Sequence, residues 1–563
     1  MKKTPRIFTP VTSFTAILDG CTKRGDKIAF RYPVGKEYAA VTYGDFANRV
    51  KALAAGITEM GLAGKRVAVI GETSVEWVAT YLAVTTAGGV IIPMDKELAI
   101  TEIEGLLASV DAEAIFFSPT FRDKLAGAIE NHPTIRLFVP FEKKEDDKAE
   151  RVVAFSDIMA KGEAVVADYT YPTRDTEALA VMLFTSGTTG SSKCVMLSEK
   201  NVCSCVHSAC ETVNFSDRDV TVSVLPLHHT YELAIMLASL AYGIEVCIND
   251  TLRHLMRNFA AYKPTGLVLV PLFVNTMHKR IWDEAKKKGK DKLLRRMMKL
   301  SNGLRKIGID LRRKLFGSVL GAFGGRLEKI ICGGAPLNPE MVKNFEAFGV
   351  QICEGYGITE CSPLIAVTPY FAPKKASVGP AVPCCEARIA PMGQKSPTGY
   401  EEGEIQVKGS NVMLGYYNND EQNAAAFTED GWYRTGDVGY MDEDGYIFIT
   451  GRLKSVIVLE NGKNVFPEEI EEYLEEIEEI AESVVVGRKD TDGETVLLTA
   501  VVYPNKDIFP DGTDEKVVYD AIWAKLAVLN KSLPSFKKLK ALEIRATEFE
   551  KTTSRKIKRH LVK

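Results

Sequence analysis

Glycine, hydroxyl and lysine side chains gather in one ten-residue run, Phe184-Thr-Ser-Gly-Thr-Thr-Gly-Ser-Ser-Lys193, between an apolar strand pattern and a helical pattern. Glycines permit a tight turn that brings backbone N–H groups close to phosphate oxygens. The hydroxyls of Thr185, Ser186, Thr188 and Thr189 add donors, and Lys193 adds a positive charge. The run is not a Walker loop, which needs Gly-Lys-Ser/Thr, because Cys194 follows the lysine. We expect a phosphate-binding loop rather than a plain Ser/Gly turn.

A second run, Glu354-Gly-Tyr-Gly-Ile-Thr-Glu360, combines three kinds of side chain that suit a bound nucleotide. A tyrosine can stack on a base, a threonine can donate to a phosphate, and a carboxylate can hold Mg²⁺, which prefers oxygen ligands. Upstream, Gly333-Gly-Ala-Pro-Leu337 follows an apolar strand pattern and could wrap a nucleobase, although alone it is only a turn.

A third run, Trp432-Tyr-Arg-Thr-Gly-Asp437, is followed by Gly451-Arg452. Asp437 is a candidate for bidentate contact with the hydroxyls of a ribose. Taken alone, an aspartate at such a position belongs more often to a turn.

These runs need a scaffold, and the chain predicts one of the α/β class. Short β-branched stretches such as Val67–Ile70, Ala180–Phe184 and Lys329–Ile331 alternate with helical patterns such as Gly44–Ala54. This alternation is typical of parallel sheets covered by helices. From about residue 380 to 450 frequent turns predict a β-rich subdomain, and a small α+β unit with strands near 483–487 and 496–503 follows. We expect a large N-terminal domain over 1–451 and a small C-terminal domain over 452–563.

The overall composition bears on the possible partners and the cellular location of the protein. The chain has 563 residues, 46% of them hydrophobic, and a net charge of −3, which does not indicate nucleic acid as a partner. Eleven cysteines without framework spacing predict reduced thiols and a cytoplasmic location. The N-terminus lacks the apolar region of a signal peptide, and the most apolar stretch, 233–248, is too short to span a bilayer.

Residues 279–314 hold fifteen Lys/Arg and four Asp/Glu, with Leu, Met and Ile between them at helical spacing. Two readings stay open, a solvated helical face and a basic amphipathic segment that contacts anionic lipid. The second would place the protein peripherally on the inner surface of a membrane.

Taken together, the runs resemble the adenylate-forming superfamily of acyl-CoA synthetases, nonribosomal peptide adenylation domains and firefly-type luciferases. The resemblance extends from Thr42-Tyr-Gly-Asp-Phe46 to Thr552-Thr-Ser-Arg-Lys-Ile557, with the runs in family order. It implies that a carboxylic acid is joined to AMP at the expense of ATP and that a thiol then takes the acyl group. It also implies a large N-terminal domain and a small mobile C-terminal domain, with the site between them.

The resemblance also implies roles for individual residues. Lys556, Thr359, Glu360, His229 and Lys454 would be catalytic: Lys556 bridges the carboxylate and the α-phosphate, Glu360 holds Mg²⁺, and Lys454 is the hinge. The implied nucleotide- and CoA-binding residues are Thr185, Ser186, Gly187, Thr188, Thr189, Gly190, Lys193, Gly334, Ala335, Glu354, Gly355, Tyr356, Gly357, Asp437, Arg452, Gly462 and Lys463. Without the resemblance, Lys551–Lys563 reads as a solvated basic tail.

Two positions depart from the family pattern. The phosphate loop usually ends in Pro-Lys-Gly, whereas this chain has Ser192-Lys193-Cys194. The lysine signature usually begins with glycine, and here Arg555 stands there. Both lysines remain, so the departures bear on loop geometry more than on chemistry.

Two segments bear on the substrate. Leu225-Pro-Leu-His-His-Thr-Tyr-Glu232 matches the family segment beside the acyl pocket, and no aspartate lies between Asp219 and Asp250 to pair with the ammonium of an amino acid. Gly451–Ile470 resembles the version found in long-chain fatty acyl-CoA synthetases. We therefore expect a medium- to long-chain fatty acid and coenzyme A as substrates, with ATP and Mg²⁺. An acyl-AMP ligase that loads a carrier protein and a non-catalytic nucleotide-binding homologue remain alternatives.

One further cluster of side chains has the spacing of a zinc site. Cys203, His207 and Cys210 share a helical face, with Cys205 nearby, as zinc ligands do. The helix directly follows the phosphate loop, so we expect these side chains to pack in the core instead.

Overall fold

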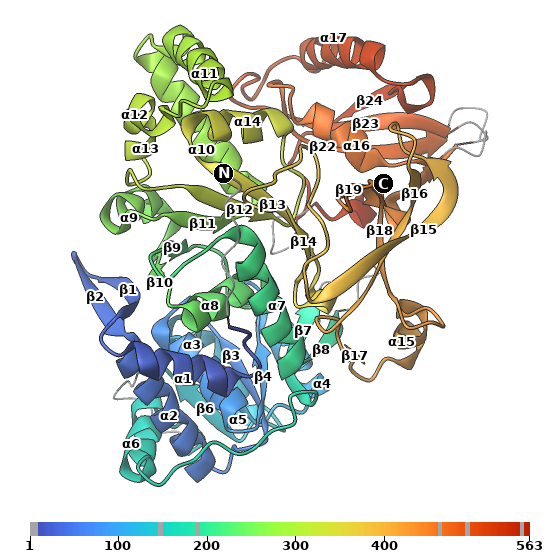
Figure 1. Cartoon of the computed structure of the whole chain (residues 1–563). Coiled ribbons are helices and arrows are strands. Elements are labelled where there is room, and N and C mark those ends of the chain that lie inside the picture. Colours follow the sequence, from blue (N-terminus) through green and yellow to red (C-terminus); the bar gives the residue numbers. More distant parts are fainter. Residues whose placement is uncertain are drawn as a thin grey trace. The chain divides into compact units, whose positions relative to one another are not determined.

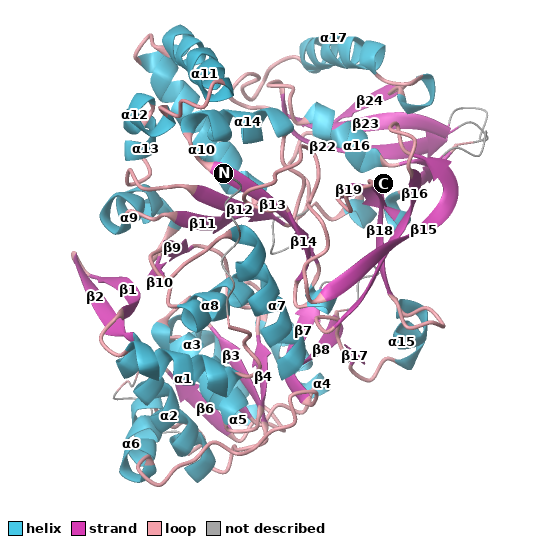
Figure 2. Ribbon diagram, in the orientation of Figure 1, coloured by secondary structure: helices cyan, strands magenta, loops and turns pink. Residues whose placement is uncertain are grey.

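A computed structural model of the protein (Figures 1 and 2) describes residues 9–142, 144, 150–185, 192–459, 464–489, 496–551 and 557–562. Internal packing divides the chain into two compact units. The first lies within Met1–Gly187, Ser191–Ala387 and Val407–Tyr433, and the second holds Arg388–Gln406 and Arg434–Lys563. This division does not test where a hinge lies, so the boundary after residue 451 stays a prediction.

The first unit contains a seven-stranded sheet of order β17-β8-β7-β4-β3-β5-β6. Strands β3 to β7 form parallel pairs, and β8 and β17 are antiparallel to their neighbours. Val67–Ile70 are completely buried, as expected of parallel strands that are covered on both faces. The strands are β3 (Arg66–Ile70), β4 (Val90–Pro93), β5 (Ala114–Phe117), β6 (Leu137–Pro140), β7 (Leu179–Thr185), β8 (Lys193–Ser198) and β17 (Gly415–Tyr416).

Helices from the first third of the chain surround this sheet (Figure 2). Several begin at a side-chain cap, as α3 does where Ser74 accepts from the backbone N–H of Trp77. The helices are α1 (Phe14–Arg24), α2 (Tyr43–Glu59), α3 (Val75–Thr86), α4 (Ile100–Ser109), α5 (Arg122–Asn131) and α6 (Phe155–Val165).

Two four-stranded sheets complete the first unit, of order β2-β1-β10-β9 and β11-β12-β13-β14. Their strands are β1 (Ile28–Val34), β2 (Glu37–Thr42), β9 (Val220–Ser223), β10 (Glu245–Ile248), β11 (Gly266–Leu269), β12 (Lys329–Gly333), β13 (Gln351–Gly357) and β14 (Leu364–Val367). The accompanying helices are α7 (Glu199–Val213), α8 (Thr230–Tyr242), α9 (Leu255–Tyr262), α10 (Pro271–Lys287), α11 (Asp291–Lys306), α12 (Arg312–Leu315), α13 (Gly317–Gly321), α14 (Pro339–Phe348) and α15 (Asp420–Ala426).

A buried ion pair joins these two smaller sheets. The Lys329 ammonium at the start of β12 lies 3.0 Å from the carboxylate of Asp219, just before β9, with the two side chains 4% and 8% exposed. Thr265 donates to the same carboxylate, and Lys329 also donates to the carbonyl of Asn214. Because every charge is hydrogen-bonded, the pair is tolerated in the core, and loss of either partner would leave a costly buried charge.

The second unit is smaller and mixes strands and helices. It contains most of a sheet of order β15-β16-β18-β19, a three-stranded sheet β22-β23-β24 and a short pair β20-β21. The elements are β15 (Cys385–Lys395), β16 (Glu401–Gly409), β18 (Tyr433–Met441), β19 (Ile447–Arg452), β20 (Ile457–Val458), β21 (Asn464–Val465), α16 (Pro467–Leu474), β22 (Ile480–Lys489), β23 (Val496–Pro504), α17 (Glu515–Ser532) and β24 (Ala541–Ile544). Leu474, Val502 and Ile522 belong to its own apolar core.

These observations confirm the predicted α/β class, and the turn-rich stretch from 380 to 450 does contain strands. All eleven cysteines are free thiols. Within the described ranges, no helix is both long and apolar enough to cross a bilayer, and residues 233–248 fall in α8 and β10.

Candidate active site

The two ends of the predicted phosphate loop are fixed by a strand pair. Thr185 ends β7 and Lys193 begins β8, and the two residues face each other across the antiparallel ladder. The Thr185 hydroxyl lies 3.5 Å from the Lys193 carbonyl oxygen. The other loop candidates, Ser186, Gly187, Thr188, Thr189 and Gly190, lie outside the described residues.

Tyr416 connects this lysine to the second run. The Lys193 ammonium donates to the side chain of Gln422 and lies 4.7 Å from the centroid of the Tyr416 ring. The hydroxyl of the same tyrosine donates to Oε1 of Glu360 over 2.8 Å. Pairing of β17 with β8 places Tyr416 opposite Val195, which brings it beside Lys193. The structure therefore brings the lysine of one predicted motif and the carboxylate of another to the same side chain.

A second tyrosine extends this contact. The hydroxyls of Tyr416 and Tyr433 are 3.3 Å apart, and because Tyr416 donates to Glu360, Tyr433 is the donor to Tyr416. Burial, followed by the Glu360 charge, raises the pKa of both phenols well above the ordinary range. Both tyrosines therefore stay protonated; Tyr416 orients the carboxylate, and Tyr433 holds the Tyr416 hydroxyl. Neither tyrosine stood out in the sequence, nor did Gln422.

Thr359 and Glu360 lie in a short 3-10 helix, η3 (Thr359–Cys361), directly after β13. The Glu360 carbonyl accepts from the N–H of Met413 over 2.8 Å. A Cβ at Gly357 would lie 2.2 Å from the carbonyl oxygen of Pro363, so only glycine permits this close return of the chain. Glu360 is thus held at its backbone by Met413 and at its side chain by Tyr416.

The residues expected to surround adenine lie at the carboxyl ends of two adjacent parallel strands. Gly333 of β12 is paired in register with Gly355 of β13. Gly334 follows β12 with a φ of +90°, a conformation that suits glycine, and Ala335 comes next. Glu354, Gly355, Tyr356 and Gly357 form the second half of β13. Ligands in open α/β sheets bind outside such strand ends, and contact of these residues with adenine stays a prediction.

His229 lies immediately before α8, in the loop that follows β9. Its ring centroid is 4.2 Å from that of His228, and the His228 Nε2 is 3.4 Å from Oδ1 of Asp95. Burial, followed by the neighbouring His229, lowers the pKa of His228 to about 3, so His228 is neutral. The Tyr231 hydroxyl donates to the carbonyl of Ile331 in β12. The His229 loop therefore lies against the strand that leads to Gly334.

Asp437 and Arg452 are direct cross-strand neighbours on β18 and β19 of the second unit. The Nε of Arg452 is 2.8 Å from Oδ1 of Asp437, whose side chain is 4% exposed, whereas that of Arg452 is 51% exposed. The two predicted ribose-binding residues are thus brought together. Their contact with a ribose stays a prediction.

The remaining candidates lie at the start and end of the C-terminal region. Lys454 is exposed in the 3-10 helix η4 (Leu453–Ser455). Gly462, Lys463 and Lys556 lie outside the described residues, as does Arg555. Lys551 and Ile557, which flank Lys556, form an antiparallel bridge.

Two carboxylates hold the residues around that bridge. Lys551 forms an ion pair with Glu482, which also accepts from the N–H of Phe549 over 3.0 Å. Arg559 forms an ion pair with Glu471, which also accepts from the N–H of Val485 over 2.6 Å. Each carboxylate therefore binds a cation and a backbone donor.

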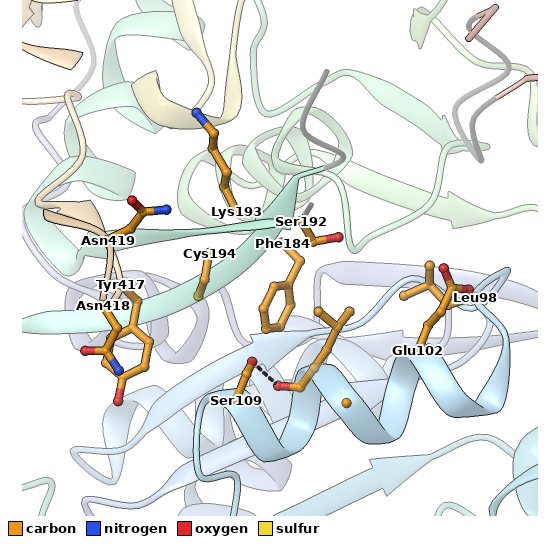
Figure 3. A pocket seen from close by; sticks show the side chains of 12 residues that line it. Leu98, Glu102, Ser109, Phe184, Ser192, Lys193, Cys194, Tyr417, Asn418 and Asn419 are labelled. Carbon is orange, nitrogen blue, oxygen red and sulfur yellow. Dashed lines mark hydrogen bonds between the residues drawn. The ribbon is translucent and has the colours of Figure 1, made fainter. Parts of the chain in front are cut away.

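A pocket of about 470 Å³ lies between α4 and the β7–β8 pair. Figure 3 shows the Phe184 ring and Ser109 inside it, with the Lys193 amine directed away from both. The Ser109 hydroxyl is already bonded to the carbonyl of Leu106. Ser192, Lys193 and Cys194 also line the pocket, so it adjoins the end of the predicted phosphate loop.

The cysteine cluster on α7 packs as expected. Cys203 and Cys210 are 1% and 3% exposed, and the Nδ1 of His207 is 2.8 Å from the Tyr242 hydroxyl. Among the described residues, no group of three or more histidine, cysteine or acidic side chains could hold a metal ion.

Comparisons with known proteins agree on one family. The family model described as AMP-binding enzyme matches residues 19–417, and the model of the AMP-binding enzyme C-terminal domain matches residues 454–563. The long-chain-fatty-acid–CoA ligase FadD15 of Mycobacterium bovis is 27% identical over 82% of this chain and 78% of its own. The peroxisomal long chain acyl-CoA synthetase 6 of Arabidopsis thaliana is 27% identical over 84% of this chain and 69% of its own.

Solved structures extend the agreement to the fold. ATP-bound MatB from Rhodopseudomonas palustris superposes with a TM-score of 0.73 at 25% identity, covering 98% of each chain. The adenylation domain of a carboxylate reductase from Mycobacterium chelonae gives a TM-score of 0.80 at 21% identity, covering 98% of this chain and 89% of its own. The large N-terminal and smaller C-terminal parts of such structures have counterparts in this chain.

Proposed function

Because the chain belongs to the family of AMP-binding enzymes, we propose that it is an ATP-dependent acyl-CoA synthetase for medium- to long-chain fatty acids. In the first half-reaction the acid carboxylate attacks the α-phosphorus of ATP, which gives acyl-AMP and releases pyrophosphate. In the second the thiol of coenzyme A attacks the acyl carbonyl, and AMP leaves. The names of the relatives at 27% identity support the acyl substrate and the acceptor.

The observation that carries the proposal is the contact chain from Lys193 through Tyr416 to Glu360. It brings a cation and a carboxylate from two distant motifs to one tyrosine, beside the strand β8 that follows the predicted phosphate loop. Lys193 would bind phosphate oxygens as a point charge. Glu360 offers the oxygen ligand that the Mg²⁺ accompanying ATP prefers, and that ion would neutralise charge on the phosphates.

The other predicted site residues would have the following roles. Thr359 would donate to a phosphate oxygen, and Gly334, Ala335 and Tyr356 would surround adenine. Lys556 would offset the charge that builds up as one anion attacks another. His229 would lie beside the acyl carboxylate. Asp437 would accept from the ribose hydroxyls with Arg452 beside it.

ATP–pyrophosphate exchange across acids of increasing chain length tests the first half-reaction. We expect exchange that depends on the acid and is strongest for medium to long chains. Absence of exchange with every acid would favour a non-catalytic nucleotide-binding homologue. Product formation with coenzyme A, compared with a phosphopantetheinylated carrier protein, separates the synthetase from a carrier-loading ligase.

We further propose that α11 contacts an anionic membrane. Leu293 and Leu300 on its outer face and Ile307, which directly follows the helix, recur every seven residues and are 51%, 59% and 71% exposed. The inner face is held by α10 and α14, with Leu294 buried.

Basic side chains flank this apolar stripe. Lys292, Arg296, Lys299 and Lys306 are exposed on the same helix. Leucine between lysine and arginine suits the boundary between lipid headgroups and acyl chains, whereas the charges would repel a second copy of the same helix. A membrane is also where long acyl chains partition, which fits the proposed substrate.

Flotation with anionic and neutral vesicles tests this contact. We expect binding to anionic vesicles only, weakened by salt because surface attraction is screened within about 8–10 Å at physiological ionic strength. Replacing Lys292 and Lys299 with glutamate should abolish binding. Replacing Lys124 and Lys161, exposed on α5 and α6, makes the same charge change and should not. Equal recovery on both vesicle types, or on neither, rules the contact out.

A further inference from the structure

Side chains around the loop that carries His229 contact three different sheets of the first unit, two of them through hydrogen bonds. His228 contacts Asp95, which follows β4; Tyr231 donates to the carbonyl of Ile331 in β12; and Glu232 is bonded to Ser223, the last residue of β9. The residues around His229 therefore connect elements of all three sheets.

Glu232 makes the most deeply buried of these contacts. It is 3% exposed, and its Oε1 lies 2.5 Å from the Ser223 hydroxyl. The backbone N–H of Leu225 also donates to its carboxyl group. One side chain thus holds both the end of β9 and the first part of the loop that leads to His229.

The carboxyl group of Glu232 is neutral at neutral pH. Burial raises its pKa to about 8, against the opposing hydrogen bonds of Ser223 and Leu225. A neutral carboxylic acid costs much less to bury than a carboxylate. Glutamine, which has nearly the same shape and no charge, should therefore replace it with little loss.

The start of α8 shows why such support is needed. His229 occupies the N-cap position, where Ser, Thr, Asp or Asn normally caps the helix, and its side chain makes no capping hydrogen bond. Glu232 stands at the third helical position, where a glutamate often bonds back to the N-cap backbone, but its carboxyl group is bonded to Ser223 and Leu225 instead. The position of His229 therefore depends on its neighbours rather than on a cap of its own.

We propose that Glu232 is a positioning residue for the acyl-activating reaction: by holding Ser223 and Leu225 it sets the path of the loop and thereby the place of the His229 imidazole. The proposal rests on the proposed function, in which His229 lies beside the acyl carboxylate. It assigns Glu232 no contact with the substrate.

The test compares variants of Glu232 with a matched buried glutamate. Glu199 is 4% exposed, begins α7, accepts the N–H of Phe14 and also has its pKa raised by burial. The variants are Glu232→Ala, Glu232→Gln, Ser223→Ala and, as the control, Glu199→Ala. For each one, acid-dependent pyrophosphate exchange is measured per folded enzyme, with separate kcat and KM for acid and ATP, together with the thermal midpoint.

We expect Glu232→Ala to lower kcat about tenfold to a hundredfold, as misplacement of a group by about 1 Å does, while KM for ATP stays within about twofold. Glu232→Gln should restore kcat to within about threefold of the wild type. Ser223→Ala, a milder change that keeps the core filled, should lower kcat about threefold to tenfold. Glu199→Ala should lower the thermal midpoint but leave kcat per folded enzyme unchanged.

Wild-type kcat in Ser223→Ala would overturn the proposal, and that variant decides the question if Glu232→Ala does not fold. So would equal losses of kcat in Glu232→Ala and Glu199→Ala, because they would indicate stability alone. Failure of the proposed function looks different: the wild-type protein itself would then show no acid-dependent exchange.

Discussion

The hydroxyl of Tyr416 donates to the carboxylate of Glu360 over 2.8 Å. This bond orients one carboxylate oxygen and leaves its charge in place. We predict that Tyr416→Phe raises the Mg²⁺ concentration needed for half-maximal exchange and lowers kcat about tenfold, the effect of one lost bond to a charged acceptor. Glu360→Gln, which removes the charge, should shift the Mg²⁺ titration further. If the Mg²⁺ titration is unchanged in both variants, Glu360 is not a metal ligand.

Lys556 is predicted to act in only one half-reaction. Loss of a cation that stabilises developing charge typically costs about 10²–10³ in rate. Lys556→Ala should therefore cripple pyrophosphate exchange, yet leave coenzyme A transfer from supplied acyl-AMP nearly intact. Single-turnover assays of each half-reaction measure the two effects. Equal losses would show that the lysine has another role.

Arg559 should support the same half-reaction through its ion pair with Glu471. Arg559→Ala removes one anchor of the residues that flank Lys556, so we expect a selective loss of exchange of about tenfold, smaller than that of Lys556→Ala. Arg488→Ala is the control, because Arg488 pairs with Glu543 over 2.9 Å in the same unit. Similar exchange rates in the two variants would contradict this prediction.

Lys454 is predicted to be the hinge between two arrangements. In the proposed mechanism, adenylation would place Lys556 at the α-phosphate, and thioester formation would need that space for the pantetheine thiol. Proline fixes φ near −65° and restricts the preceding residue. Lys454→Pro should keep much of the exchange and lose most acyl-CoA formation. Full acyl-CoA synthesis by this variant would falsify the hinge.

The stability of the protein should depend on pH through Glu232. Its folded pKa is about 8, whereas its ordinary value is 4.5, so the folded state keeps a proton that the unfolded chain releases between these values. Its contribution to the free energy of unfolding therefore falls as pH rises from 4.5 to 8, by at most about 1.4 kcal/mol per pH unit, and is level above pH 8. Glutamine does not titrate. Denaturant unfolding from pH 5 to 9 should show that the free energy of unfolding of Glu232→Gln increases relative to that of the wild type as the pH rises. A difference that does not change with pH would contradict the raised pKa of Glu232.

Local sequence patterns predicted much of the fold and suggested many of the candidate site residues. The secondary structure of continuous apolar strands such as Val67–Ile70, and of the helix that contains Gly44, can be predicted from the sequence, because the periodicity of apolar residues is a property of neighbouring positions. A phosphate loop could be predicted for the same reason, since its glycines and hydroxyls are contiguous in the sequence, and that assignment stays a prediction.

Residues that act through distant contacts could not be found that way. Tyr416 reaches Glu360 only because β17 pairs with β8, and no local pattern specifies a two-residue strand. Asp95 meets His228 across more than a hundred residues, and Glu232 looked like an ordinary residue of a helix's first turn. Such roles depend on which strand ends become neighbours, and a single sequence does not encode that in any short window.

The buried pair of Lys329 and Asp219 has a consequence for recombination between relatives. Asp219 stands just before the strand that leads to the His229 loop, and Lys329 begins the strand that leads to Gly334. A chimera whose crossover falls between the two positions inherits them from different parents. If one parent lacks its partner, the hybrid carries an isolated charge in its core. Crossovers before Asp219 or after Lys329 keep the pair together, so the segment 219–329 can be exchanged as one unit without separating the two charges.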